Sequence, residues 1–199
     1  MPPKVKITKE AILDIAVEIV RKEGAQAVNA RTLASVLGCS TQPVFSNFEN
    51  MEQLRLAMVE RADTMCNQYI AREIEKGEYP NYKASGMAYI RFAKEEKELF
   101  KLLYMRDRTG ETFPQPLGMT DQIETVVAQN TGLAGDQVKL FHLEMWAVVH
   151  GIASMVATGF VDLEQELVSR MLSDAYQGLR KEWSEKNGSH PNDRADETI

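Results

Sequence analysis

The chain of 199 residues is poor in cysteine, and its two cysteines, Cys39 and Cys66, cannot build a disulfide framework. It contains no uninterrupted run of 18 apolar residues, so we expect no transmembrane helix. The basic N-terminus lacks the apolar stretch of a signal peptide, because Glu10, Asp14 and Glu18 interrupt it. These absences favour a cytoplasmic protein that has no membrane partner.

Motifs for catalysis and for metal binding are also missing from the sequence. It has no Gly-rich phosphate loop, no serine nucleophile motif and no pair of carboxylates at a catalytic spacing. His142 and His150 lie eight residues apart without a third ligand, so a core or pocket role explains each histidine better than metal binding. We therefore expect no enzymatic activity, no metal and no cofactor.

The charge of the chain is unevenly distributed. The net charge is −6, which argues against nucleic-acid binding when the chain is taken as a whole. Residues 1–48 contain six basic and four acidic residues and therefore carry +2, whereas residues 49–199 carry −8. A basic segment on an acidic remainder favours contact between that segment and a polyanion, and chance scatter is the alternative.

Apolar residues recur every three or four positions along almost the whole chain, which predicts helices and no strand. Residues suited to capping place helix starts after Thr8, Asn29 and Asn50. A dense group of Gly and Pro between residues 106 and 120 predicts a long loop. We expect an all-α fold of about nine helices, the eighth of which is apolar around most of its circumference and buried from several sides.

Two short helices that follow a longer first helix are typical of a helix-turn-helix. Ser40 is expected to cap the second short helix, Thr41 to Phe48, and Val44 and Phe48 to hold it to the core. The exposed residues of this helix are small or polar enough to approach base edges: Thr41, Gln42, Ser46 and Asn47. This pattern predicts a DNA-binding head, and an ordinary helical hairpin with a polar outer face is the alternative.

The same region resembles the DNA-binding head of TetR-type bacterial transcriptional regulators. The resemblance is carried by residues 12–16 through Gly24, by residues 31–34 through 38–40, and by residues 44–48. Residues 146–151, Trp-Ala-Val-Val-His-Gly, resemble the Trp-x-x-x-His-Gly signature in the regulatory domain of one TetR subgroup, and residues 89–93 and 99–102 are similar to that subgroup. The resemblance extends from about residue 8 to residue 183 in the right order and spacing.

This resemblance implies a homodimeric repressor that binds double-stranded operator DNA and is released by a small-molecule effector. It divides the chain into a DNA-binding head (residues 1–50), a ligand-binding and dimerisation body (residues 51–183) and a flexible tail (residues 184–199). Asn29 and Arg31 would hold phosphates, and Lys4 and Lys6 would form an N-terminal arm. The full set of implied DNA-binding residues is Lys4, Lys6, Asn29, Arg31, Ser40, Thr41, Gln42, Phe45, Ser46 and Asn47.

Three residues depart from the family pattern in this head. Phe45 stands where the family usually has a Tyr whose hydroxyl reaches a phosphate, and Met51 stands where Lys is common. Glu49 adds a negative charge where the DNA backbone should pass. Because each lost phosphate contact weakens binding, the alternative function is a helical ligand-binding protein with weakened or lost operator binding. A small all-helical enzyme is a third hypothesis.

The regulatory body contains aromatic residues at helical spacing, each of which is explained first as a core residue. As a group they would line an apolar effector cavity, and they are Tyr89, Phe92, Phe100, Tyr104, Trp146 and His150. The helix from Met51 to about Lys76 is the predicted switch element, with the loop 107–119 as a lid. The last two helices expose a broad apolar face, which predicts a dimer interface around Val168, Met171, Leu172 and Ala175. The sequence identifies neither the effector nor the operator.

Overall fold

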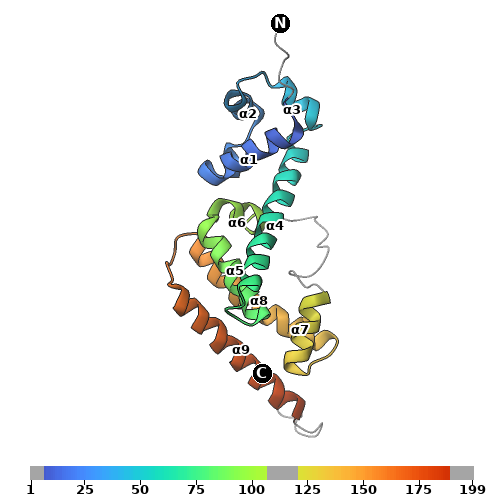
Figure 1. Ribbon diagram of the computed structural model, residues 1–199, viewed down its shortest axis with the longest axis vertical. Coiled ribbons are helices and arrows are strands. Elements are labelled where there is room, and N and C mark those ends of the chain that lie inside the picture. Colours follow the sequence, from blue (N-terminus) through green and yellow to red (C-terminus); the bar gives the residue numbers. More distant parts are fainter. Residues whose placement is uncertain (1–6, 107–120, 189–199) are drawn as a thin grey trace, which may run out of the picture.

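Nine α-helices and one short 3-10 helix make up the regular structure of the computed structural model, which describes residues 7–106 and 121–188 (Figure 1). The helices are α1 (Lys9–Glu23), η1 (Ala25–Ala27), α2 (Ala30–Leu37), α3 (Gln42–Asn47), α4 (Met51–Lys76), α5 (Asn81–Glu95), α6 (Lys97–Tyr104), α7 (Asp121–Thr131), α8 (Asp136–Ala157) and α9 (Gln165–Gly188). The described residues contain no strand, so the expected all-α fold is confirmed.

Three predicted helix starts are confirmed by side-chain caps. The hydroxyl of Thr8 accepts a hydrogen bond from the amide of Ala11. The side-chain oxygen of Asn29 accepts from two amides at the start of α2, and Thr32 completes a capping box by bonding back to the Asn29 amide. Asn50 caps α4 in the same way by accepting from the amide of Gln53 at 2.9 Å. Each cap of this kind contributes about 1 kcal/mol to helix stability.

Two helix boundaries differ from the prediction. α3 begins at Gln42 after Thr41, so Ser40 is not its N-cap, and no side chain caps it. α9 continues to Gly188, so residues 184–188 are helical rather than part of a flexible tail. The polar composition of this segment suggested a tail, but polar and charged residues also suit the exposed turns of a long helix. Residues 189–199 lie outside the described residues.

The three helices α1–α3 form a head at one end of an elongated molecule, and α4 runs from this head into the body (Figure 1). One continuous set of buried residues joins the two parts, since α1 packs against both α4 and α6. The fully buried rings of Phe48 in the head and of Phe92 and Phe100 in the body belong to this set. Burying such a side chain stabilises the fold by about 1.5–3 kcal/mol. Head and body therefore share a core instead of being linked by a flexible tether.

A second core lies at the other end of the body, where α7, α8 and α9 meet. It is built from Val127, Leu133, Val138, Phe141 and Met145, all buried. α8 also packs against α5 and α6, so the expectation that it is covered from several sides is confirmed. α8 is the one helix of the described residues that is long and apolar enough to cross a membrane, and it packs here against α5, α6, α7 and α9.

A buried ion pair joins α4 to α5, the two helices with the largest contact. Glu73 on α4 is only 1% exposed, and its Oε2 lies 2.6 Å from Arg91 Nη1 on α5 and 3.0 Å from Lys76 Nζ. The Arg91 guanidinium also lies over the ring of Tyr69, 5.6 Å from its centroid. Burial by itself raises the pKa of Glu73, but the hydrogen bond from Lys76 and the charge of Arg91 outweigh it and hold the pKa below its usual value. Glu73 is therefore ionised inside the interface between α4 and α5.

Candidate nucleic-acid interface

The turn between α2 and α3 depends on Gly38, which adopts the left-handed conformation with φ 63° and ψ 34°. A side chain is disfavoured in this conformation, so glycine fits the position. The amide of Gly38 bonds to the carbonyls at the end of α2, and the amide of Cys39 bonds to the Ala34 carbonyl at 3.0 Å. These bonds end α2 tightly and leave only four residues between α2 and α3, which is the geometry of a helix-turn-helix.

α3 has one face in the core and one face in solvent. Val44 and Phe48 are 0% and 1% exposed and fix the helix to α1 and α2, as the sequence predicted. Gln42, Phe45 and Ser46 share the opposite, exposed face, because positions three and four apart lie on one side of a helix. Phe45 is 51% exposed, which is unusual for a phenylalanine inside a helix.

Two of the predicted polar readers of α3 already use their polar atoms within the protein. The Asn47 side-chain nitrogen donates to the carbonyls of Pro43 at 2.8 Å and Ile7 at 3.4 Å. The Ser46 hydroxyl donates to the Gln42 carbonyl at 2.9 Å. Asn47 therefore fastens the chain before α1 to the end of α3. The Gln42 amide makes no hydrogen bond within the part of the chain that the structure describes, and it lies on the exposed face of α3.

The remaining predicted DNA contacts lie around the start of α2 and the turn. The side chain of Asn29 is occupied in capping α2, where it bonds to the amides of Arg31 and Thr32 at 3.0 Å. Arg31 follows in the first turn of α2 and is exposed. Ser40 is exposed, and Thr41 is partly buried at the start of α3. The implied arm residues Lys4 and Lys6 lie outside the described residues.

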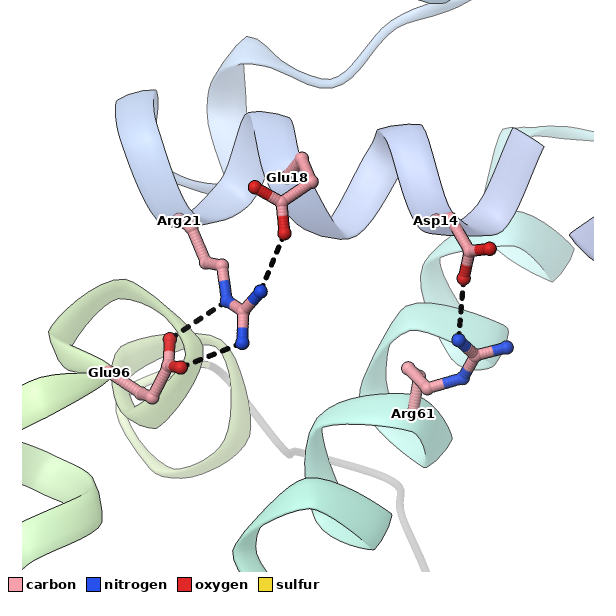
Figure 2. A network of polar contacts seen from close by, with 5 residues as sticks. All are labelled: Asp14, Glu18, Arg21, Arg61 and Glu96. Atoms are coloured by element: carbon pink, nitrogen blue, oxygen red, sulfur yellow. Dashed lines mark hydrogen bonds and ion pairs between the residues drawn. The ribbon is translucent and has the colours of Figure 1, made fainter. Parts of the chain in front are cut away.

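Ion pairs fasten the head to the body along one side of α1 (Figure 2). The guanidinium of Arg21 makes two hydrogen bonds to Glu96, at 2.9 and 2.7 Å, across the junction between α5 and α6. Arg61 on α4 bonds to Asp14 and to Glu10 of α1, both at 2.6 Å. No sequence motif indicates these pairs, because Arg21 and Glu96 are 75 positions apart. They hold α1 against both helices that lead into the body.

The predicted effector residues come together in the body, with one exception. Five of them form a cluster of rings in which His150 stacks on Trp146, with centroids 4.4 Å apart and planes at 9°. The Tyr89 hydroxyl lies 2.9 Å from His150 Nδ1, and the rings of Phe100 and Tyr104 pack beside it. The exception is Phe92, which packs its edge against Tyr69 of α4.

This ring cluster, defined as Tyr89, Phe100, Tyr104, Trp146 and His150, extends from the core toward the surface. Tyr89 and Phe100 are buried, whereas the other three side chains are partly exposed. Burial lowers the pKa of His150, so its imidazole is neutral at pH 7. A surface depression of about 430 Å³ lies elsewhere, on α7, and is lined by Glu124, Thr125, Ala128 and Gln129. The lid predicted at residues 107–119 lies outside the described residues.

The residues predicted for the dimer interface pack against the body of their own chain. Val168 and Leu172 are 4% and 3% exposed and face the core of their own chain. Leu172 packs so closely on α5 that a methyl group added to Gly86 would lie 3.2 Å from it. Met171 is partly buried beside the core that joins head and body, and Ala175 is partly buried beside the second core. The apolar stripe of α9 thus covers its own body, which the sequence pattern cannot distinguish from a stripe that covers a partner.

The outward faces of α8 and α9 carry other apolar residues. On α8, two leucines that are 46% and 40% exposed are followed by two small residues, at spacings of three and four. α9 contributes one exposed leucine near its start. The residues of this outer face are Leu140, Leu143, Ala147 and Gly151 on α8, and Leu167 on α9.

Comparisons with known proteins find similarity to helix-turn-helix regulators. Residues 82–175 match the family described as "Tetracyclin repressor-like, C-terminal domain". The chain is 20% identical to YobS, an uncharacterised HTH-type transcriptional regulator of Bacillus subtilis, over 86% of this chain and 90% of that protein. It is 22% identical to Rv0681, an uncharacterised HTH-type transcriptional regulator of Mycobacterium tuberculosis, over 79% of this chain and 73% of that protein.

Two solved structures share the fold over nearly the whole chain. The crystal structure of a TetR-like transcriptional regulator from Rhodococcus sp. RHA1 has a TM-score of 0.63 at 16% identity and covers 95% of this chain and 100% of that one. A protein with unknown function from the same organism has a TM-score of 0.67 at 22% identity, and the match covers 92% of this chain and 98% of that one. The fold of head and body together is thus the fold of this group of proteins.

Proposed function

We propose that the protein is a DNA-binding transcriptional regulator, and the match of residues 82–175 to the tetracyclin repressor-like C-terminal domain family supports this proposal. The single observation that carries the proposal is the geometry of α3. Buried Val44 and Phe48 hold this short helix to the core, while Gln42 and Phe45 project from its exposed face. A helix placed in this way after a tight turn is the element that enters the major groove in helix-turn-helix proteins.

Two exposed side chains of the head, Gln42 and Arg31, contact the DNA in this proposal. The Gln42 amide reads a base edge, since a glutamine makes two hydrogen bonds to adenine in the major groove. Arg31 contacts the phosphate backbone beside the groove and positions the head without reading sequence. Asn29 acts through its cap of α2, and Asn47 through the bonds that hold the start of the chain to α3.

The regulator acts as a dimer in this proposal, and the outer face of α8 and α9 is the contact surface. Two copies related by a two-fold axis would stack these faces as a bundle of four helices. The small residues Ala147 and Gly151 would let the two α8 helices approach closely, and Leu140 and Leu143 would supply the buried apolar area. The dimer also supplies the second recognition helix that a two-fold operator requires.

We propose that the protein is a repressor, and that a small-molecule effector releases it from DNA by binding at the ring cluster. A neutral imidazole and two tyrosine hydroxyls give the cluster a few polar groups among apolar rings, which suits a flat and largely apolar ligand. The stacked pair of Trp146 and His150 belongs to the Trp-x-x-x-His-Gly pattern, and it supports the assignment to the TetR subgroup that carries this signature. A cytoplasmic location follows from a DNA-binding role.

Selection of bound fragments from sheared bacterial genomic DNA by the purified full-length protein tests this function. We expect a small set of enriched fragments, bound with an affinity that falls steeply with salt as condensed counterions are released. Matched fragments of random sequence are the control. Enrichment no greater than that of the random fragments would refute operator recognition and favour the alternative of a helical ligand-binding protein, which Glu49, Met51 and Phe45 suggest.

A further inference from the structure

The exposed phenyl ring of Phe45 has no role in the core of the head. Its neighbour Val44 is completely buried, and Phe48 is 1% exposed, so the apolar side of α3 is already complete. Phe45 points away from that side and leaves 51% of its surface in solvent. Covering this apolar area with another molecule would be favourable.

The surroundings of Phe45 define what can cover it. Gln42 precedes it by one turn and Ser46 follows it directly, so the ring lies within the polar face that we assign to the major groove. Base edges in that groove are polar, with one exception, which is the C5 methyl group of thymine. A phenyl ring held against the groove floor is therefore complementary to thymine and to no other base.

The hydrogen-bonding pattern of α3 supports the same base composition. Because the donors of Ser46 and Asn47 bond to backbone carbonyls, Gln42 is the main polar reader, and glutamine pairs with adenine. Three residues along a helix advance about 4.5 Å, which is close to the separation of about 3.4 Å between successive bases. A helix lying along the groove would therefore bring these two side chains to neighbouring base pairs.

We propose that Phe45 is a specificity-determining residue that reads a thymine methyl group next to the base pair contacted by Gln42. The preferred half-site then contains two adjacent A·T pairs. This inference rests on the proposed DNA-binding function. It explains the absence of a hydroxyl at position 45, because the ring contacts the groove floor instead of a phosphate.

The test uses DNA in which single methyl groups are removed. The full-length protein selects duplexes from a random-sequence library, and the preferred duplex is then synthesised with deoxyuridine in place of each thymidine in turn. Covering one methyl group corresponds to about a 4-fold change in affinity. We therefore expect about a 4-fold loss at one thymine per half-site, and about 15-fold when both half-sites are changed.

Protein variants identify the side chain that is responsible. Phe45→Ala should bind the methylated and demethylated duplexes equally, whereas Gln42→Ala should bind more weakly but keep the methyl dependence. Phe45→Leu retains an apolar group and should keep part of the methyl dependence. Methyl dependence of equal size in the wild type and in Phe45→Ala, or none in the wild type, would overturn the assignment of Phe45 while DNA binding stands. If no sequence is enriched from the library, the proposed function itself fails, and the inference fails with it.

Discussion

Replacing Arg91 by methionine is expected to destabilise the protein by leaving a carboxylate buried between α4 and α5. Glu73 is 1% exposed, and its two cationic partners both contact Oε2. Removal of one partner from a buried ion pair costs about 3–5 kcal/mol. Lys76 remains in place but its side chain is 44% exposed, so the expected loss lies at the lower end, about 3 kcal/mol.

The loss is measurable by thermal unfolding at a fixed protein concentration, because the stability of a dimer depends on concentration. For a chain of this size, about 3 kcal/mol corresponds to a decrease in Tm of about 6–12 °C. Lys181→Met is the matched control, since Lys181 is exposed on α9 and its substitution should leave Tm within about 1 °C.

The pH dependence of the loss follows from the lowered pKa of Glu73. A carboxyl group whose pKa is lower in the folded state stabilises the protein above its unfolded pKa, and this contribution disappears as pH falls through the folded value. The difference between wild type and Arg91→Met should therefore be largest near pH 7. It should shrink below about pH 4, where a protonated Glu73 needs no cation.

A second substitution separates the buried charge from simple loss of packing. The double variant Glu73→Leu with Arg91→Met removes both charges and should recover most of the lost stability, because apolar residues often replace a buried pair at little cost. Two results would refute the reasoning. One is a decrease in Tm of the same size at pH 4 and pH 7, and the other is a double variant less stable than Arg91→Met alone.

Three further predictions concern the head and the dimer. Gln42→Ala should lower discrimination between operator and random DNA by about 1–3 kcal/mol. Arg31→Ala should weaken binding to both kinds of DNA and reduce the slope of log affinity against log salt by about 1. If fluorescence titrations gave the two variants equal losses on the two kinds of DNA, these roles would be contradicted. Arg21→Ala should speed hydrogen exchange of the α1 amides, because it loses its two bonds to the body, and unchanged exchange would show that apolar packing alone holds the head. Leu143→Asp should give monomers in sedimentation at micromolar concentration, whereas Leu56→Asp, at a similarly exposed leucine on α4, should leave the dimer intact.

Features that depend on short stretches of sequence could be predicted. Thr8, Asn29 and Asn50 cap their helices through amides two or three residues away, so their roles are visible in the local pattern. The core face of α3 follows in the same way from the spacing of Val44 and Phe48. The aromatic cluster of the body was also found, because its members recur at helical spacing on three segments that pack together.

Features that depend on long-range packing could not be predicted. Arg21 and Glu96 meet only because α1 crosses the junction between α5 and α6, and neither residue differs in sequence from an ordinary surface charge. Leu172 belongs to an apolar stripe of α9 that suits its own core and a second chain equally well. The Asn47 amide looks like a base reader until the carbonyls of Ile7 and Pro43 are seen beside it.

The length of α4 has a mechanical consequence for the head. With 26 residues the helix is about 39 Å long, and it is anchored at its far end by the contacts with α5. A small tilt of this helix about that anchor would be magnified at the head. A tilt of about 5° moves the head end by about 3 Å, which is close to one base-pair step. In a two-fold dimer the two α4 helices would swing in opposite directions, so the spacing of the recognition helices would change by twice that distance.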